Sequence, residues 1–213
     1  MSQGIFISFE GPDGGGKTTV SKAVCEKLLE EGFPICYTRE PGGSEIAEEI
    51  RNIILDPKNT AMDVRTEALL YAASRRQHLT DKIIPALNEG KIVISDRFLD
   101  SSLAYQGCGR GIGIEEVYAI NQFAVENYLP IKTIFLHVDA ELGLKRIQEG
   151  RANLDRLDQE SIEFHKRVYE GYQKIIELYR DRMIIIDANQ DIEDVIRDAY
   201  LAVKEILADE GFA

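Results

Sequence analysis

Five short runs of the chain are apolar at nearly every position, a pattern typical of strands buried on both faces of a parallel sheet. Their apolar residues are mostly β-branched or aromatic, which favours strand over helix in runs this short. The five predicted strands are IFISFE at 5–10, PICYTRE at 34–40, KIVISDR at 91–97, TIFLHVDA at 133–140 and MIIIDA at 183–188.

Stretches with a helical period separate these runs. Within 159–180, for example, Phe164, Val168, Tyr172 and Ile175 recur every three or four residues. Strands that alternate with helices predict an α/β domain with helices on both faces of the sheet. In such sheets ligands bind at the carboxyl ends of the strands, so the residues after each strand are the first candidates for chemistry. The predicted helices cover about 18–32, 63–89, 114–128, 159–180 and 191–209.

Length, composition and net charge limit the number of domains, the cellular location and the kinds of partner that this chain can have. The 213 residues, 44% of them apolar, fit one domain with a substantial core. We expect a cytoplasmic protein, since no stretch approaches membrane-spanning length and no basic N-terminal region precedes an apolar run. Cys25, Cys36 and Cys108 have no metal-binding spacing and are expected to remain reduced. A formal net charge of −12 argues against nucleic acid or an anionic membrane as a partner.

The segment GPDGGGKTT joins the first predicted strand to the first predicted helix. It fits the template G-x-x-x-x-G-K-[ST], in which backbone N–H groups and a helix N-terminus surround a phosphate. Lys17 would reach the β- and γ-phosphates, and the Thr18 hydroxyl would bind Mg²⁺. A glycine-rich turn without a ligand is the alternative, which the match in both template and context disfavours. The predicted polyphosphate-binding residues are Gly11, Pro12, Asp13, Gly14, Gly15, Gly16, Lys17, Thr18 and Thr19.

Two further predicted strands end in charged residues. Asp96 is placed to hold Mg²⁺ or its waters, and the Arg97 guanidinium could donate two hydrogen bonds to a phosphate. The alternative is that the two residues only pair with each other in a turn. The segment TREPGG sets Glu40 at another strand end, before a turn that Pro41 constrains, and the next helix carries Arg51. The carboxyl edge of the sheet therefore combines cations with carboxylates.

Two segments offer side chains suited to the polar edge of a nucleotide base. In DSSLAYQG, Ser102, Tyr105 and Gln106 share a face of a predicted helical turn. In EALLYAASRRQ, Tyr71 and Arg75 lie four apart, so a ring to stack on a base accompanies a guanidinium to reach its carbonyl. For each segment, a core tyrosine beside a surface polar group remains the alternative.

A polar stretch at about 146–158 lies between the fourth strand and a long helix. It carries Arg146, Arg151 and Arg156, and near a phosphate site such an arginine-bearing loop is typical of a lid. A solvated charged loop is the alternative.

Five segments occur in the order and at the approximate spacing found in bacterial thymidylate kinases, which the chain resembles from about residue 5 to 165. They are FEGPDGGGKTT, TREPGG, ASRRQHL, SDRFLDSSLAYQG and NLDRLDQES. The resemblance implies a single P-loop NTPase domain over 1–213, with a five-stranded parallel sheet, helices on both faces and a short lid. It implies phosphoryl transfer from Mg·ATP to dTMP, giving dTDP for dTTP synthesis, by what is usually a homodimer. The alternatives are a kinase for another nucleoside monophosphate and a non-catalytic nucleotide-binding protein.

Positions that match the family's motifs imply roles for individual residues. Arg75 and Gln106 resemble the residues that read thymine, and Tyr71 resembles the ring that stacks on it. Tyr105 would lie under the deoxyribose, while Glu40 and Asp13 resemble the carboxylates that organise the acceptor sugar, the magnesium or its waters. The residues expected to bind dTMP are Glu40, Pro41, Arg51, Tyr71, Arg75, Arg97, Ser102, Tyr105 and Gln106.

The phosphate loop contains no arginine, which resembles family members that supply this arginine from the lid. Arg151 and Arg156 are therefore expected to act on the transferred phosphoryl group, with Arg146 as a weaker candidate. Thr18 and Asp96 are expected to hold magnesium. The residues expected to take part in catalysis are Lys17, Asp96, Arg97, Arg151 and Arg156.

Overall fold

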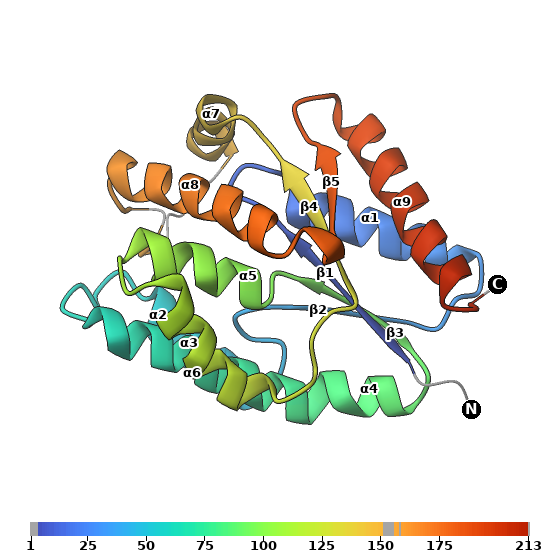
Figure 1. The fold of residues 1–213 in the computed structure, drawn as a ribbon, viewed down its shortest axis with the longest axis horizontal. Coiled ribbons are helices and arrows are strands. Elements are labelled where there is room, and N and C mark those ends of the chain that lie inside the picture. The colour runs from blue at the N-terminus through green and yellow to red at the C-terminus, as the bar shows by residue number, and fades with distance from the viewer. Residues whose placement is uncertain (1–3, 151–155, 158, 213) are drawn as a thin grey trace.

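A computed structural model describes residues 4–150, 156–157 and 159–212. Five parallel strands form one sheet in the order β2-β3-β1-β4-β5 (Figure 1). The five predicted strands are confirmed, although the fourth ends earlier than predicted because a helix begins at Ala140. The strands are β1 Ile5–Glu10, β2 Ile35–Arg39, β3 Ile92–Asp96, β4 Lys132–His137 and β5 Met183–Asp187.

The helices agree with the predicted alternation and differ in detail. The predicted helix 63–89 consists of α3, a π-helical turn at Leu79–Ile83, and α4. Pro85 near the start of α4 has no N–H to donate, and the π turn before it absorbs the interruption. The α-helices are α1 Lys17–Glu30, α2 Glu45–Leu55, α3 Val64–His78, α4 Ile84–Asn88, α5 Leu99–Ser102, α6 Ile114–Val125, α7 Ala140–Gly150, α8 Ile162–Leu178 and α9 Ile192–Asp209.

The segment after β3 is helical in two ways. It starts as α5 and continues as a π-helical segment, Leu103–Gly109, rather than as the α-helical turn that the sequence pattern predicts. A π-helix holds one residue more in each hydrogen-bonded turn than an α-helix does, and such segments are frequent at functional sites. Helix α7 was not predicted. Its first residue was expected to end the fourth strand and its last five to belong to the lid, and no element was expected at 141–145.

Two apolar cores lie on opposite faces of the sheet. Alternate residues of β1 point to opposite faces, so Ile5, Ile7 and Phe9 pack with α1 and α9 while Phe6 packs in the other core. Figure 1 shows α1 and α9 together on one side of the sheet and α5 and α8 on the other. This arrangement confirms the predicted α/β architecture with helices on both faces.

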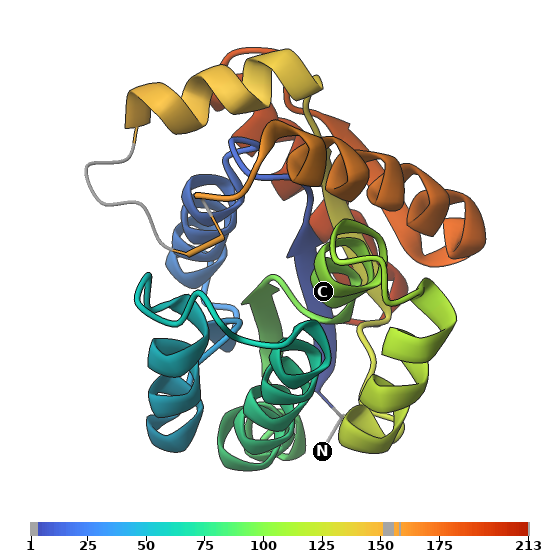
Figure 2. The same cartoon turned by 90° about the vertical axis from the view of Figure 1, so that its left-hand side faces the viewer.

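Helices α2, α3 and α6 form a neighbouring set, with α3 in contact with both others (Figure 2). Among the described helices, none is long and apolar enough to cross a membrane. Because all five strands are parallel, their carboxyl ends share one edge, where Glu10, Arg39 and Asp96 are the last residues of β1, β2 and β3.

Candidate active site

The loop between β1 and α1 is shaped by glycines. Gly14 has a φ of +78°, and a Cβ there would lie 2.2 Å from the carbonyl oxygen of Gly143. Any other residue would therefore be both strained and in collision with α7. Helix α1 begins at Lys17, whose ammonium group donates to the carbonyl oxygen of Pro12 at 2.8 Å. The glycine loop and helix N-terminus predicted from GPDGGGKTT are thus present together.

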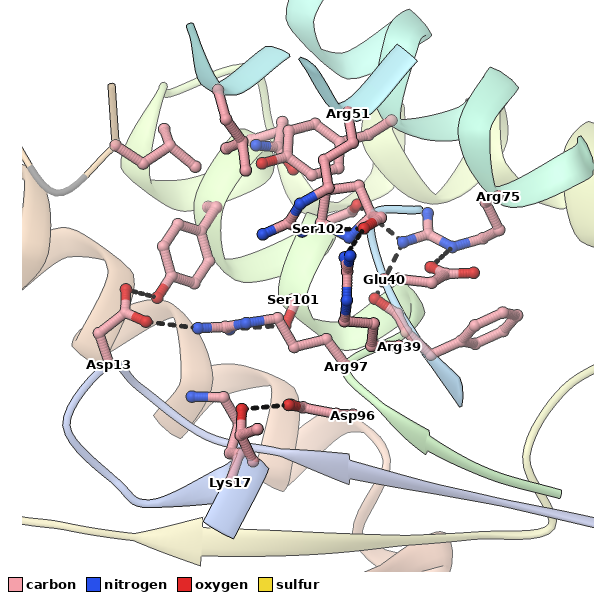
Figure 3. Close-up of a pocket in the computed structure, with 18 of the residues that line it drawn as sticks. Asp13, Lys17, Arg39, Glu40, Arg51, Arg75, Asp96, Arg97, Ser101 and Ser102 are labelled. Atoms are coloured by element: carbon pink, nitrogen blue, oxygen red, sulfur yellow. Dashed lines mark hydrogen bonds and ion pairs between the residues drawn. The ribbon is translucent and has the colours of Figure 1, made fainter. Parts of the chain in front are cut away.

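Lys17 and Thr18 lie beside Asp96 at the end of β3. Burial, reinforced by the nearby charge of Arg97, lowers the pKa of Lys17 to about 8, and the charges of Asp13 and Asp96 act in the opposite direction. The Thr18 hydroxyl donates to Asp96 Oδ2 (Figure 3). The described residues contain no cluster of three or more His, Cys, Asp or Glu side chains able to hold a metal. A hydroxyl and one carboxylate nevertheless suit Mg²⁺, which keeps several waters and takes further oxygens from substrate phosphates.

Arg97 has a left-handed backbone conformation, with a φ of +70°. Such a conformation in a non-glycine residue is costly and clusters at active sites. The Arg97 guanidinium donates to Asp13 Oδ1 at 2.5 Å and to Ser101 Oγ at 3.0 Å, and it lies over the Tyr105 ring (Figure 3). The Tyr105 hydroxyl donates to the other oxygen of Asp13. Asp13 therefore ties the phosphate loop to Arg97 and Tyr105.

Glu10 supports this arrangement and was not singled out from the sequence. Its side chain is buried at the end of β1 and accepts hydrogen bonds from Phe98 N at 2.7 Å and Ser101 Oγ at 2.6 Å. Burial, together with the negative charge of Asp100, raises the pKa of Glu10 to about 7. In IFISFE it reads as the polar end of a strand, and no local pattern reveals that it anchors the backbone after Arg97.

Arg75 lies buried at the other end of the site. Its Nε donates to Glu40 Oε2 at 2.8 Å, one terminal nitrogen donates to Phe98 O at 2.9 Å and Ser102 Oγ at 3.1 Å, and the other donates to Asn121 Oδ1. The second oxygen of Glu40 contacts His78 Nδ1 at 3.1 Å. Three predicted residues, Arg75, Glu40 and Ser102, are thereby brought together, whereas Asn121 was missed because it lies in a helix without a recognisable motif.

Gln106 and Arg51 have partners that orient them. Gln106 Nε2 donates to Glu67 Oε1 at 3.0 Å, and Arg51 donates to the carbonyl oxygen of Pro41 at 2.8 Å. The Glu40–Pro41 peptide bond is cis. Both side chains line the same cavity as Lys17. The volume of this cavity is about 390 Å³, within the range of small-molecule sites.

Most of the predicted site residues line that cavity, whereas Gly11, Pro12, Gly15 and Arg156 do not. Figure 3 shows Lys17, Asp96 and Arg97 toward one end, with Arg51, Ser102 and Arg75 toward the other. Arg39, which also lines it, donates to the carbonyl oxygen of Pro41 at 2.9 Å. The sequence-predicted residues that line the cavity are Asp13, Gly14, Gly16, Lys17, Thr18, Thr19, Glu40, Pro41, Arg51, Tyr71, Arg75, Asp96, Arg97, Ser102, Tyr105, Gln106 and Arg146.

The three arginines of the predicted lid have different positions. Arg146 lies on α7 and donates to the carbonyl oxygens of Ala188 at 2.9 Å and Gly14 at 3.4 Å. Arg151 lies outside the described residues. Arg156 is buried and donates to the carbonyl oxygen of Ile54 at 2.8 Å and to Glu67 Oε2 at 2.5 Å. The structure therefore places Arg156 beside Glu67, the partner of Gln106, and its action on the transferred phosphoryl group stays a prediction.

Comparison with known proteins gives consistent results. The family model described as thymidylate kinase matches residues 9–199. The chain is 57% identical to the thymidylate kinase of Enterococcus faecalis and 55% identical to that of Geobacillus sp. strain WCH70, in each case over 95% of this chain and 97% of the relative. A crystal structure of thymidylate kinase from Ehrlichia chaffeensis covers 97% of this chain and 99% of its own, with a TM-score of 0.76 and 34% identity. The predicted fold class, an α/β P-loop NTPase with a five-stranded parallel sheet, is confirmed.

Proposed function

Because the chain belongs to the thymidylate kinase family and phosphorylates dTMP to dTDP with ATP, we propose roles for the two ends of the cavity in that reaction. The end with Lys17 and Thr18 would hold Mg·ATP, and the end with Arg75 and Gln106 would hold the base of dTMP. The observation that carries this proposal is that one cavity joins a glycine loop to a buried set of hydrogen-bonding side chains. Tyr71 lines the cavity and would stack on the base.

The acceptor is itself a phosphate, which decides what the residues must do. Its second ionisation lies near pKa ~6, so the attacking oxygen is mostly deprotonated at neutral pH and needs no strong base. The obstacle is repulsion between two polyanions that must meet in line. We propose that Lys17, Arg97 and Arg51 reduce this repulsion and fix the geometry. Thr18 and Asp96 would hold Mg²⁺, which neutralises phosphate charge when bound.

Tyr105 and Asp13 line the cavity between its two ends, and we propose that they contact the sugar of dTMP. The Tyr105 hydroxyl is committed to Asp13, and the Arg97 guanidinium covers the ring, so the phenol is held in one position. We propose that this fixed ring lies under the deoxyribose and disfavours a 2′-hydroxyl. The stretch from about 146 to 158 would close over the phosphates as a lid.

Release of ADP with Mg·ATP, measured against dTMP, dUMP, dCMP, dAMP, dGMP, UMP and thymidine, tests the assignment of the site. We expect kcat/KM for dCMP at least about 10³-fold below that for dTMP, since a site built for specific hydrogen bonds rejects an analogue that leaves them unmade. Thymidine, which lacks the phosphate, should be inactive. Preference for another monophosphate would contradict the roles of Arg75 and Gln106, and no activity with any of them would favour a non-catalytic nucleotide-binding protein.

We also propose a cytoplasmic location and a place in dTTP synthesis. All three cysteines are free thiols. Burial raises the pKa of Cys25 to about 12, so this thiol resists deprotonation and oxidation. Free thiols of this kind are usual in a reducing compartment. The product dTDP would need one further phosphorylation to become dTTP.

A homodimer through helices α2, α3 and α6 is proposed from the apolar side chains on these helices. Ile46 and Ile53 on α2 and Leu69 on α3 are about half exposed, and Phe123 on α6 is 91% exposed. Exposed apolar side chains on adjoining helices mark an interaction surface, and a second copy of the chain would cover it.

Phe123→Asp is expected to convert this homodimer to a monomer, because the substitution would bury an unpaired charge at the interface. Light scattering coupled to size-exclusion chromatography measures the mass. Leu201→Asp is the matched control, because Leu201 is also exposed but lies on α9, away from the proposed interface. A wild-type protein with the mass of a monomer, or a Phe123→Asp variant that remains dimeric, would contradict this interface.

A further inference from the structure

Glu67 accepts hydrogen bonds from three side chains, which come from two separate parts of the chain. It is a residue of α3 with 1% of its surface exposed. Gln106 of the π-helical segment donates to its Oε1, Arg110 donates to both oxygens at 3.0 to 3.2 Å, and Arg156 donates to Oε2. The family's motifs assign no role to this carboxylate, yet it joins a predicted base-reading residue to the end of the predicted lid.

The charge state of Glu67 determines what it can do. Burial alone would favour the neutral acid, but the hydrogen bond and charge of Arg110, with the hydrogen bonds from Gln106 and Arg156, hold the pKa of Glu67 below its ordinary value. An ionised carboxylate only accepts hydrogen bonds. Gln106 must therefore turn its Nε2 toward Glu67, because its carbonyl oxygen would repel the carboxylate.

Because Glu67 fixes the orientation of the Gln106 side-chain amide, it also fixes which atom of that amide, the oxygen or the nitrogen, faces the cavity. With Nε2 bound to Glu67, the Oε1 atom on the other side of the amide is the atom that Gln106 offers to the cavity it lines. An oxygen in that place accepts a hydrogen bond and cannot donate one. It matches a base whose ring nitrogen carries a hydrogen, as N3 of thymine does, and it opposes a base such as cytosine, whose N3 is an acceptor.

Arg75 completes the pattern with the opposite polarity. Its guanidinium has five N–H groups, and among the described residues four of them are directed at Glu40, Asn121, Phe98 O and Ser102. The remaining N–H belongs to a side chain that lines the cavity and is suited to a base carbonyl. One donor beside one acceptor matches the O4 and N3–H edge of thymine.

We infer that Glu67 is a positioning residue for base selection, which fixes the amide of Gln106 so that its carbonyl oxygen faces the base. The inference rests on the proposed function, in which Gln106 reads the base of dTMP. Glu67 touches neither substrate nor reacting atoms in this scheme. Its effect is on recognition, so it should change KM for dTMP and the preference among bases more than kcat.

The variant Glu67→Gln tests this with little change in shape. Glutamine both donates and accepts, so it no longer dictates which way Gln106 turns. We expect KM for dTMP to rise about tenfold with kcat changed by less than about threefold, and the ratio of kcat/KM for dTMP over dCMP to fall. Glu160→Gln is the matched control, because Glu160 pairs with Arg110 at 2.6 Å without contacting Gln106. That variant should keep both KM and the dTMP preference.

A double-mutant cycle with Gln106→Ala separates positioning from general support of the fold. If Glu67 acts through Gln106, adding Glu67→Gln to Gln106→Ala should change KM for dTMP by less than about twofold. The same loss in both backgrounds would overturn the inference. An effect of Gln106→Ala without one of Glu67→Gln would overturn it while leaving the proposed function intact. A silent Gln106→Ala would instead remove Gln106 from the proposed function.

A measurement on the unaltered protein covers the case in which Glu67→Gln fails to fold. In the dTMP complex, NMR should place the side-chain NH₂ protons of Gln106 near the guanidinium protons of Arg110 or Arg156. Close contact of these NH₂ protons with the imino proton on N3 of thymine would show the opposite amide orientation and overturn the inference.

Discussion

Replacing Lys17 by methionine is expected to lower kcat by at least about 10³-fold, the largest loss we expect from any single substitution in this chain. Lys17 begins α1, is nearly buried and is held toward the phosphate loop by the carbonyl oxygen of Pro12. Its charge would face the β- and γ-phosphates, where the transition state needs neutralisation. Methionine keeps the length and volume of the side chain and removes the charge.

The Lys17→Met variant should lose activity without losing stability. The folded protein holds the pKa of Lys17 at about 8, below the ordinary value of 10.5. The charged lysine therefore destabilises the folded state, fully below pH 8 and progressively less as pH rises from 8 to 10.5. We expect thermal unfolding at pH 7 to show a variant as stable as the wild type or more stable, with the difference shrinking toward pH 10.

Steady-state kinetics and thermal unfolding of Lys17→Met and Lys22→Met test both statements together. Lys22 is an exposed lysine of the same helix, so its variant controls for loss of a positive charge on α1. Near-normal kcat in Lys17→Met would contradict the phosphate-loop assignment. A loss of activity accompanied by a large fall in melting temperature at pH 7 would indicate that Lys17 supports the fold instead.

Arg151→Ala is expected to lower kcat by about 10³-fold while changing KM for dTMP by no more than a few-fold, because an arginine that contacts the transferring group stabilises the transition state. The phosphate loop supplies no arginine of its own, and the three lid arginines are the available substitutes. Arg156 was predicted to share this role. Its contacts with Glu67 and Ile54 instead lead us to expect that Arg156→Ala mainly raises KM for dTMP.

Kinetics of Arg146→Ala, Arg151→Ala and Arg156→Ala under the same conditions distinguish these roles. Arg146 contacts the carbonyl oxygens of Gly14 and Ala188 at the donor end of the cavity, so its loss should act mainly on KM for ATP. Normal turnover in both the Arg151 and the Arg156 variants would contradict a lid arginine at the transferred phosphoryl group. A large fall in kcat for Arg156→Ala alone would restore the original prediction for that residue.

The sheet and the phosphate loop were predictable because their signals are local. IFISFE is apolar over consecutive residues, and GPDGGGKTT needs its glycines for backbone geometry. The structure of each segment can therefore be predicted from its own residues alone. Arg75, Ser102 and Gln106 were predictable from the family's motifs. Their presence in a single cavity depends on the order of the strands, which brings distant segments to the same edge.

The supporting carboxylates were not predictable for a physical reason. Glu67 stands in RTEALLYAASRRQ, where it reads as an exposed acidic residue in the first turn of a helix. Its burial depends on Arg110 and Arg156, which lie 43 and 89 residues away along the chain. Glu10 is likewise defined by contacts with Phe98 and Ser101, 88 and 91 residues away. Partners at such distances leave no periodicity in the sequence around either carboxylate.

The π-helical segment Leu103–Gly109 has a consequence for how this gene can change. An α-helix advances by one turn in 3.6 residues, so each residue accounts for about 100° of rotation. Loss of a single codon within this segment would let an ordinary α-helix form, with better hydrogen-bond geometry. It would also rotate the side chains after the deletion, including that of Arg110 directly behind the segment, by about that angle away from Glu67. A deletion that improves the local helix would thus cost the enzyme its base selection, whereas point substitutions leave the register intact.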